Sequence, residues 1–169
     1  MCTQAEETAT DEDVFGFPLM SLQNNQWYLQ GFVQQDYVRP ICVPRSEDDL
    51  AVYGQTLFIT GFGENPDGTV AEIKKKIQTS LISNDECREK MKLIGNITPI
   101  TPYQLCSEDH PNSTDTTCAG DDGGPVMSSK KLRWFIEGLS STYTCGENEP
   151  QTHLKIYKYL KWIKLSIRD

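Results

Sequence analysis

Cys118-Ala119-Gly120-Asp121-Asp122-Gly123-Gly124-Pro125 is the stretch of sequence that decides the fold of this chain. Taken alone, the octapeptide is explained by an acidic turn between two strands, because Gly, Asp and Pro all favour turns. The segments on either side of it are more informative than its composition, since several of them carry short motifs in a fixed order.

Six further segments carry such motifs. In chain order they are Val38-Arg39-Pro40-Ile41-Cys42-Val43-Pro44, Thr60-Gly61-Phe62-Gly63, Ser83-Asn84-Asp85-Glu86-Cys87, Gln104-Leu105-Cys106, Cys145-Gly146 and Tyr159-Leu160-Lys161-Trp162-Ile163. Together with the octapeptide they resemble the motifs of trypsin-like serine proteases, over roughly residues 38–163. The octapeptide resembles the signature Cys-x-Gly-Asp-Ser-Gly-Gly-Pro, and the first of the six resembles the V-x-P-I-C-L-P segment that enters the second barrel of the family.

The resemblance implies an all-β fold, the Greek-key β-barrel of the trypsin-like fold, followed by a C-terminal α-helix. Residues 38–169 are expected to form the second barrel with that helix, and residues 1–37 an acidic N-terminal segment with remnants of the first barrel. Gly16–Leu22 resembles an early strand of the first barrel, and Asp36–Val38 its exit. All-β folds of this family run to roughly 200–250 residues, whereas this sequence has 169, and the shortfall falls before Cys42.

The catalytic residues of the family have no match here. Asp122 stands at the position of the nucleophilic Ser, and a carboxylate at pH 7 has no proton for a neighbouring imidazole to remove. The family's oxyanion hole uses the backbone N–H groups at the positions of Gly120 and Asp122, where a fixed carboxylate would repel developing negative charge or fold back into the hole. The catalytic His lies before the second barrel in the family, but no His precedes Cys42, and we expect His110 and His153 to be solvated and non-catalytic. The resemblance therefore implies a pseudoenzyme.

The substrate pocket of the family is also altered. Thr116 falls at the specificity position, Tyr143 puts a bulky ring where a small residue opens the pocket, and Gln151 replaces a Gly of the opposite wall. The residue that Asp121 matches pairs, in active members, with the amino terminus created by activation cleavage. No basic residue precedes Arg39, so we expect Asp121 to be solvated or to pair differently.

The six cysteines suit an oxidising compartment, but their spacing alone does not select a pairing. The resemblance implies the disulfides Cys87–Cys106 and Cys118–Cys145. The Cys that Cys42 matches often bonds to a propeptide in the family, which leaves Cys2–Cys42 as a weaker prediction and a bond from Cys2 to another chain as its alternative.

Two Asn-x-Ser/Thr sequons, at Asn96 and Asn112, indicate a secreted glycoprotein. No signal peptide is visible, because acids follow Met1 where a basic and then an apolar run would be needed. No apolar run is long enough to span a membrane. We expect an extracellular protein without a cofactor or a metal.

Charge is unevenly distributed along this chain, whose net charge is −8. Glu6–Asp13 is an acidic run, and near the C-terminus basic residues recur every three or four positions, at Lys155, Lys158, Lys161, Lys164 and Arg168. On a helix they form one face, and Ile156, Leu160, Ile163 and Ile167 form another. The simpler interpretation is a surface helix packed on the barrel, and the alternative is a face that binds a heparin-like polyanion or an acidic partner. The overall acidity argues against nucleic acid as a partner.

Local patterns predict several elements. Leu57–Thr60 is expected to be a strand, while Ile73, Ile77 and Leu81 fit a strand and a helix face equally, with the resemblance favouring a strand. Ser83 and Glu86 form a capping-box pattern at the start of a short helix through Met91. Val126–Met127 and Leu132–Ile136 flank the polar Ser128–Lys131, as the strands of a hairpin flank its turn.

These features predict a secreted, non-catalytic serine protease homologue of the arthropod haemolymph type. It would bind a protein partner from an extracellular protease cascade of innate immunity, as a cofactor, decoy or regulator. One alternative is a truncated splice product or gene model of a trypsin-like serine endopeptidase homologue, with no function of its own. Another is an active hydrolase that uses Asp121 or Asp122, which the lack of a nearby His, Lys or metal cluster in the sequence disfavours.

Overall fold

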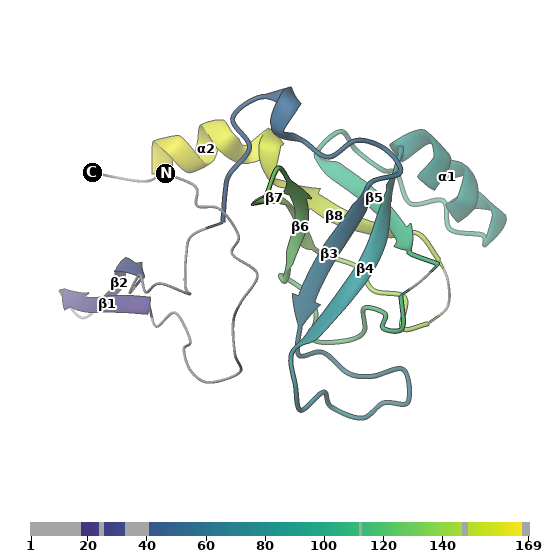
Figure 1. Ribbon diagram of the computed structural model, residues 1–169, viewed down its shortest axis with the longest axis horizontal. Helices are drawn as coiled ribbons and strands as arrows, with labels where there is room; N and C mark the ends of the chain where they lie inside the picture. The colour runs from purple at the N-terminus through teal and green to yellow at the C-terminus, as the bar shows by residue number, and fades with distance from the viewer. Residues whose placement is uncertain (1–17, 24–25, 33–40, 112, 147–148, 167–169) are drawn as a thin grey trace.

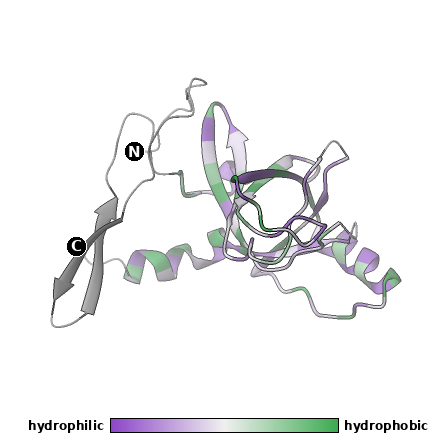
Figure 2. Ribbon diagram, turned by 90° about the horizontal axis from the view of Figure 1, so that it is seen from below, coloured by the Kyte–Doolittle hydropathy of each residue, from purple (hydrophilic) through white to green (hydrophobic). Residues whose placement is uncertain are grey.

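The computed structural model describes residues 18–23, 26–32, 41–111, 113–146 and 149–166 (Figure 1). Six antiparallel strands close into a barrel in the order β3-β4-β5-β8-β7-β6, and Figure 2 shows the ring that they form. The strands are β3 (Thr56–Gly61), β4 (Lys75–Ile82), β5 (Gln104–Asp109), β6 (Pro125–Lys130), β7 (Arg133–Ser140) and β8 (Gln151–Lys155). The predicted all-β barrel is confirmed.

The core of the barrel is built from inward-facing side chains, since successive residues of a strand point to opposite faces. It consists of Leu57, Ile59, Ile77, Leu81, Leu105 and Val126. Ile77 and Leu81 are therefore strand residues, as the resemblance favoured. Ile73 instead lies ahead of β4 and is exposed.

Two α-helices lie on opposite sides of the barrel in Figure 1. The first, α1 (Asn84–Leu93), begins after Ser83, whose hydroxyl accepts a hydrogen bond from the N–H of Glu86 at 3.1 Å. The predicted cap is thus present, although the Glu86 carboxylate pairs with Lys90 rather than returning to Ser83. A second core joins this helix to the barrel and consists of Ile82, Cys87, Met91, Ile100 and Cys106.

The chain leaves β8 through a 3₁₀ turn, η2 (Ile156–Tyr159), and enters the short helix α2 (Leu160–Ser166), which confirms the predicted C-terminal helix. Ile156 is buried and Leu160 and Ile163 are half-buried, while Ile167 lies outside the described residues. Another 3₁₀ turn, η1 (Glu47–Asp49), precedes β3. None of the helices in the described ranges is long and apolar enough to cross a membrane.

The β6–β7 hairpin differs from the prediction. Ser128, Ser129 and Lys130 were expected in its turn, but they belong to β6, and the connection consists of Lys131 and Leu132 alone. These two residues have φ angles of 49° and 61°. Two consecutive positive φ angles are those of a type I′ turn, which matches the twist of the flanking strands.

A separate two-stranded sheet precedes the barrel. It is the hairpin of β1 (Pro18–Gln23) and β2 (Gln26–Phe32), with Leu22 paired to Trp27. The expected early strand at Gly16–Leu22 falls largely on β1. The division into residues 1–37 and 38–169 stays a prediction.

Candidate functional site

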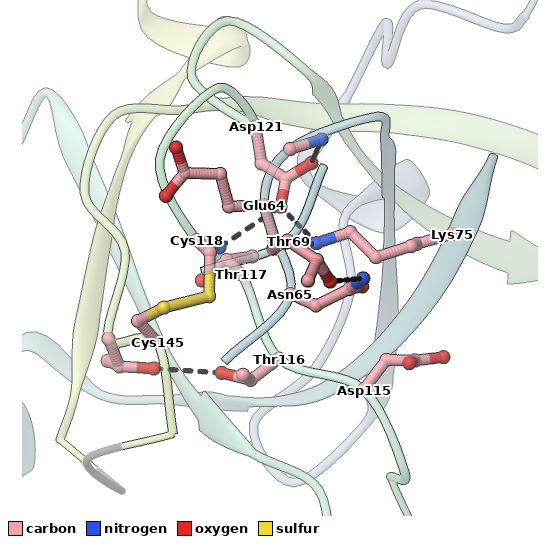
Figure 3. Close-up of polar contacts among 12 residues, drawn as sticks. Glu64, Asn65, Thr69, Lys75, Asp115, Thr116, Thr117, Cys118, Asp121 and Cys145 are labelled. Carbon is pink, nitrogen blue, oxygen red and sulfur yellow. Dashed lines mark hydrogen bonds and ion pairs between the residues drawn. A yellow bond between two sulfur atoms is a disulfide. The ribbon is translucent and has the colours of Figure 1, made fainter. Parts of the chain in front are cut away.

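Asp121 is buried and forms an ion pair with Lys75 (Figure 3). Its Oδ2 lies 3.0 Å from Nζ of Lys75, and the side chains of Asp121 and Lys75 are 0% and 6% exposed. The carboxylate also accepts hydrogen bonds from the N–H groups of Gly63 at 2.8 Å and Cys118 at 3.0 Å. Lys75 donates a further bond to the carbonyl of Glu64 at 2.7 Å. Asp121 was expected either to be solvated or to have a partner other than a new amino terminus. The second expectation is confirmed, and the partner is Lys75.

Two glycines make room for this carboxylate. A Cβ at Gly63 would lie 2.6 Å from Oδ2 of Asp121, and a Cβ at Gly61 would overlap Oδ1. Gly61 pairs with Lys75 across β3 and β4. The register of the two strands therefore places Lys75 beside the space that Gly61, which has no side chain, leaves for the Asp121 carboxylate. The Thr60–Gly63 motif and the octapeptide are two halves of one site.

Sequence reasoning did not identify Lys75, although a signal for it exists. Lys75 lies on the same face of β4 as the buried Ile77 and Leu81, because the three alternate along the strand. Its neighbours Lys74 and Lys76 are exposed. A lysine on the buried face of a strand needs a carboxylate partner. Asp121 was the acid that sequence reasoning had left without a cation.

Asp122 is exposed on the same loop, and within the described residues nothing forms a hydrogen bond with its carboxylate. It does not fold back onto Gly120, which is exposed and has a φ angle of 91°. In this part of the structure the N–H groups of Gly120 and Asp122 donate to no protein acceptor. The loop thus keeps two available donors next to a negative charge that opposes the binding of an anion.

A buried polar network occupies the place of the predicted specificity pocket. Gln151 is fully buried, accepts a hydrogen bond from the Thr117 hydroxyl at 2.9 Å and donates one to Oδ1 of Asp109 at 2.9 Å. The Thr116 hydroxyl lies 3.0 Å from that of Thr144. Burial raises the pKa of Asp109, and the hydrogen bonds from Thr116 and Gln151 oppose this shift.

Tyr143 lies outside this network. Its side chain is 49% exposed, whereas Gln151 is 0% exposed. Gln151, and not Tyr143, therefore fills the buried space. The loop of Tyr143 is nevertheless tied to the site, because the N–H of Cys145 donates to the carbonyl of Thr117 at 2.8 Å. The assignment of Thr116, Tyr143 and Gln151 to a degenerate specificity pocket stays a prediction.

His153 was expected to be solvated, and this prediction is wrong. The residue lies in β8, is 0% exposed, and its Nε2 is 2.8 Å from the hydroxyl of Ser107 on the neighbouring strand β5. Its Nδ1 has no hydrogen-bond partner among the described residues. Burial lowers the pKa of His153 from 6.5 to about 3, so the imidazole is neutral in the folded protein. Because both side chains are fully buried, they form a structural pair that substrate cannot reach.

The buried His153 predicts a loss of stability in acid. As the pH falls, the unfolded chain binds a proton at the ordinary pKa of 6.5, whereas the folded chain does so only near 3. Between pH 7.5 and pH 5 this difference should lower the free energy of unfolding by about 2 kcal/mol. Burial raises the pKa values of Asp109 and Glu137, and this contribution to the pH dependence of stability has the opposite sign.

Urea unfolding at the two pH values, with His153→Gln as the matched variant, measures this contribution. We expect the variant to have a smaller difference between the two free energies. An equal difference in both proteins would contradict the assignment.

The structure contains the disulfides Cys87–Cys106 and Cys118–Cys145, as the resemblance implied. Cys42 is buried, but Cys2 lies outside the described residues, so Cys2–Cys42 stays a prediction. Asn96 is exposed, and Asn112 is also outside the described residues. Within the described part of the chain, no group of three or more His, Cys, Asp or Glu side chains could hold a metal ion.

Comparison with known proteins agrees with this geometry. A family model described as Trypsin matches residues 17–163. Phenoloxidase-activating factor 1 of Holotrichia diomphalia is 32% identical over 136 residues, which are 79% of this chain and 36% of that protein. CLIP domain-containing serine protease B9 of Anopheles gambiae is 28% identical over 142 residues, 83% of this chain and 34% of that protein. CLIP domain-containing serine protease B15 of the same organism is 32% identical over 134 residues, 76% of this chain and 36% of that protein. The chain thus spans about a third of the length of these relatives.

Proposed function

Because the chain belongs to the trypsin family of serine proteases, we propose that it is a non-catalytic member that acts by binding a component of an extracellular protease cascade. The observation that carries this proposal is Asp122, an exposed carboxylate at the position of the nucleophile on a loop that is otherwise folded and held in place. Serine chemistry needs a hydroxyl there and a base beside it. A binding function needs only the surface.

The loops around Asp122 support a binding role. The N–H of Glu64 donates to the carbonyl of Ala119 at 2.8 Å, so the loop after β3 is attached directly to the octapeptide. This loop and that of Tyr143 carry large exposed apolar side chains, with Phe62 at 54% and Val70 at 71% exposure. Loops fixed on a rigid scaffold are common binding elements, and exposed apolar groups are common contacts.

The relatives support the setting of this function. One is named for activating phenoloxidase and two are named as CLIP domain-containing serine proteases, all from insects. We therefore place the chain in an insect immune cascade, as a cofactor, decoy or regulator. The disulfides Cys87–Cys106 and Cys118–Cys145 and the exposed sequon at Asn96 fit a secreted glycoprotein.

A binding experiment tests the proposal. The chain, with its disulfides formed, is immobilised, and a purified CLIP-domain serine protease of an insect is titrated over it. We expect saturable binding that Asp122→Ala leaves unchanged and that Phe62→Asp with Tyr143→Asp weakens at least tenfold, because a buried charge opposes apolar contact. Binding that depends on Asp122 and is indifferent to these two side chains would contradict the proposed surface.

A further inference from the structure

The C-terminal end of the chain forms an apolar groove beside the barrel. The groove encloses about 770 Å³. The barrel contributes Tyr103, Leu139 and Leu154 to its wall, and η2 and α2 contribute Tyr159 and Trp162. The helix α2, which forms part of its wall, lies on the opposite side of the barrel from α1 (Figure 1). None of the residues that line the groove belongs to the Asp121 site.

The side chains of the groove are more exposed than apolar residues of this size usually are. Trp162 is 66% exposed, Leu165 is 75% exposed and Tyr103 is 53% exposed. Tyr103 contacts Tyr159 with ring centroids 5.7 Å apart. In the part of the chain that the structure describes, nothing covers these groups, and contiguous exposed apolar surface of this kind marks an interaction site.

The rim of the groove is positively charged. Lys158 and Lys161 line it, and Lys164 follows one turn later on α2. No acidic residue occurs in the sequence between Glu149 and Ser166. An occupant should therefore bring both carboxylates and apolar side chains. A polyanion such as heparin would satisfy the lysines but not the apolar hollow.

One segment of this chain has that composition. Residues 6–17 contain an acidic run that ends at Asp13 and is followed at once by Val14, Phe15 and Phe17. No Lys or Arg occurs before Arg39, so the segment has no basic residue of its own to neutralise it.

The segment can also reach the groove. Cys42 is bonded to β7, because its N–H donates to the carbonyl of Trp134 at 2.9 Å and its carbonyl accepts from Ile136 at 2.9 Å. Leu139, on the same strand, lines the groove about 13 Å away from Phe135 by the rise of a strand. The residues 33–41 alone span up to about 30 Å when extended.

We propose that residues 6–17 dock in this groove, with their carboxylates beside Lys158 and Lys161 and an aromatic side chain over Trp162. The occupant is this chain's own acidic and aromatic segment. Docking buries the exposed apolar surface and neutralises the basic rim in one step. The inference does not depend on the function proposed above.

Photo-crosslinking of the full chain tests the proposal. Phe15 is replaced by benzoylphenylalanine, the protein is irradiated at micromolar concentration, and the linked peptides are identified by mass spectrometry. We expect links within one chain to residues 154–165. Lys158→Glu with Lys161→Glu should lower their yield roughly tenfold, since two attractions become repulsions. Lys74→Glu with Lys92→Glu, also on exposed lysines, should have no effect.

Further measurements distinguish the other outcomes. Raising NaCl from 0.05 to 1 M should lower the yield in the unmodified sequence, and circular dichroism should show that the charge variants are folded. A mixture of isotopically labelled and unlabelled protein reveals links between chains. Such links would identify a second copy as the occupant and overturn the proposal. Links to residues other than Tyr103, Leu139 and 154–165, or a yield that does not respond to Lys158 and Lys161, would overturn it equally.

Discussion

Replacement of Lys75 by methionine is expected to lower the free energy of unfolding by roughly 3–5 kcal/mol, the usual effect of removing one partner of a buried ion pair. Methionine keeps the length of the side chain but leaves the Asp121 carboxylate, 0% exposed, without its cation. The two N–H donors from Gly63 and Cys118 would remain, but they do not replace a full charge. Chemical denaturation of the variant measures the change.

Two matched variants separate this effect from the loss of any lysine. Lys74→Met removes an exposed lysine of the same segment and should change stability by no more than about 0.5 kcal/mol. Lys75→Met combined with Asp121→Asn removes both charges and should recover a substantial part of the loss. A Lys75→Met protein as stable as Lys74→Met would show that the ion pair does not hold the loop.

Removal of the Cys118–Cys145 disulfide is expected to cost about 3–4 kcal/mol, because the bond closes a loop with a sequence separation of 27 residues. The effect arises chiefly from the larger conformational freedom of the unfolded chain. It is measured by denaturation of the Cys118→Ala/Cys145→Ala variant. Non-reducing peptide mapping of the unmodified protein should recover this pair and Cys87–Cys106.

The Cys87–Cys106 bond provides the comparison. Its sequence separation is 19 residues, so the same reasoning gives a cost of about 3 kcal/mol for its removal. The N–H of Cys118 also donates to Asp121. We therefore expect the loss of stability in Cys118→Ala/Cys145→Ala combined with Lys75→Met to be smaller than the sum of the two separate losses. For Cys87→Ala/Cys106→Ala combined with Lys75→Met, the losses should add. Free thiols at any of these four cysteines would contradict the fold.

Local sequence patterns predicted the elements that depend on local physics. The strand at Leu57 and the cap at Ser83 follow from alternation and from the hydrogen-bonding capacity of a serine, which act within a few residues. The hairpin turn was misplaced because Lys131-Leu132 lacks the Asn-Gly or Gly signal that usually marks two consecutive positive φ angles. Its boundaries were decided by pairing with the neighbouring strand instead.

The features of the site that sequence reasoning missed are non-local. Lys75 meets Asp121 only because the register of β3 and β4 places it opposite Gly61. His153 is buried because β8 lies between β5 and β7, and the segment Gln151–Lys155 is too short and too polar to reveal an inward face. In both cases a polar group is tolerated inside because a specific partner from another part of the chain meets it, Asp121 on the loop before β6 for Lys75 and Ser107 on β5 for His153.

The central claim is that this chain, which has Asp122 at the position of the nucleophile and no His before Cys42, lacks peptidase activity. The most direct measurement incubates the disulfide-bonded chain, and separately its Asp122→Ser variant, with fluorogenic Arg, Phe and Ala peptides and with a fluorophosphonate probe. We expect background turnover and no labelling from both proteins, because a serine restored without its base is not activated. Turnover above that of a boiled control, or labelling at Ser128 or Ser141 of the unmodified chain, would contradict the claim.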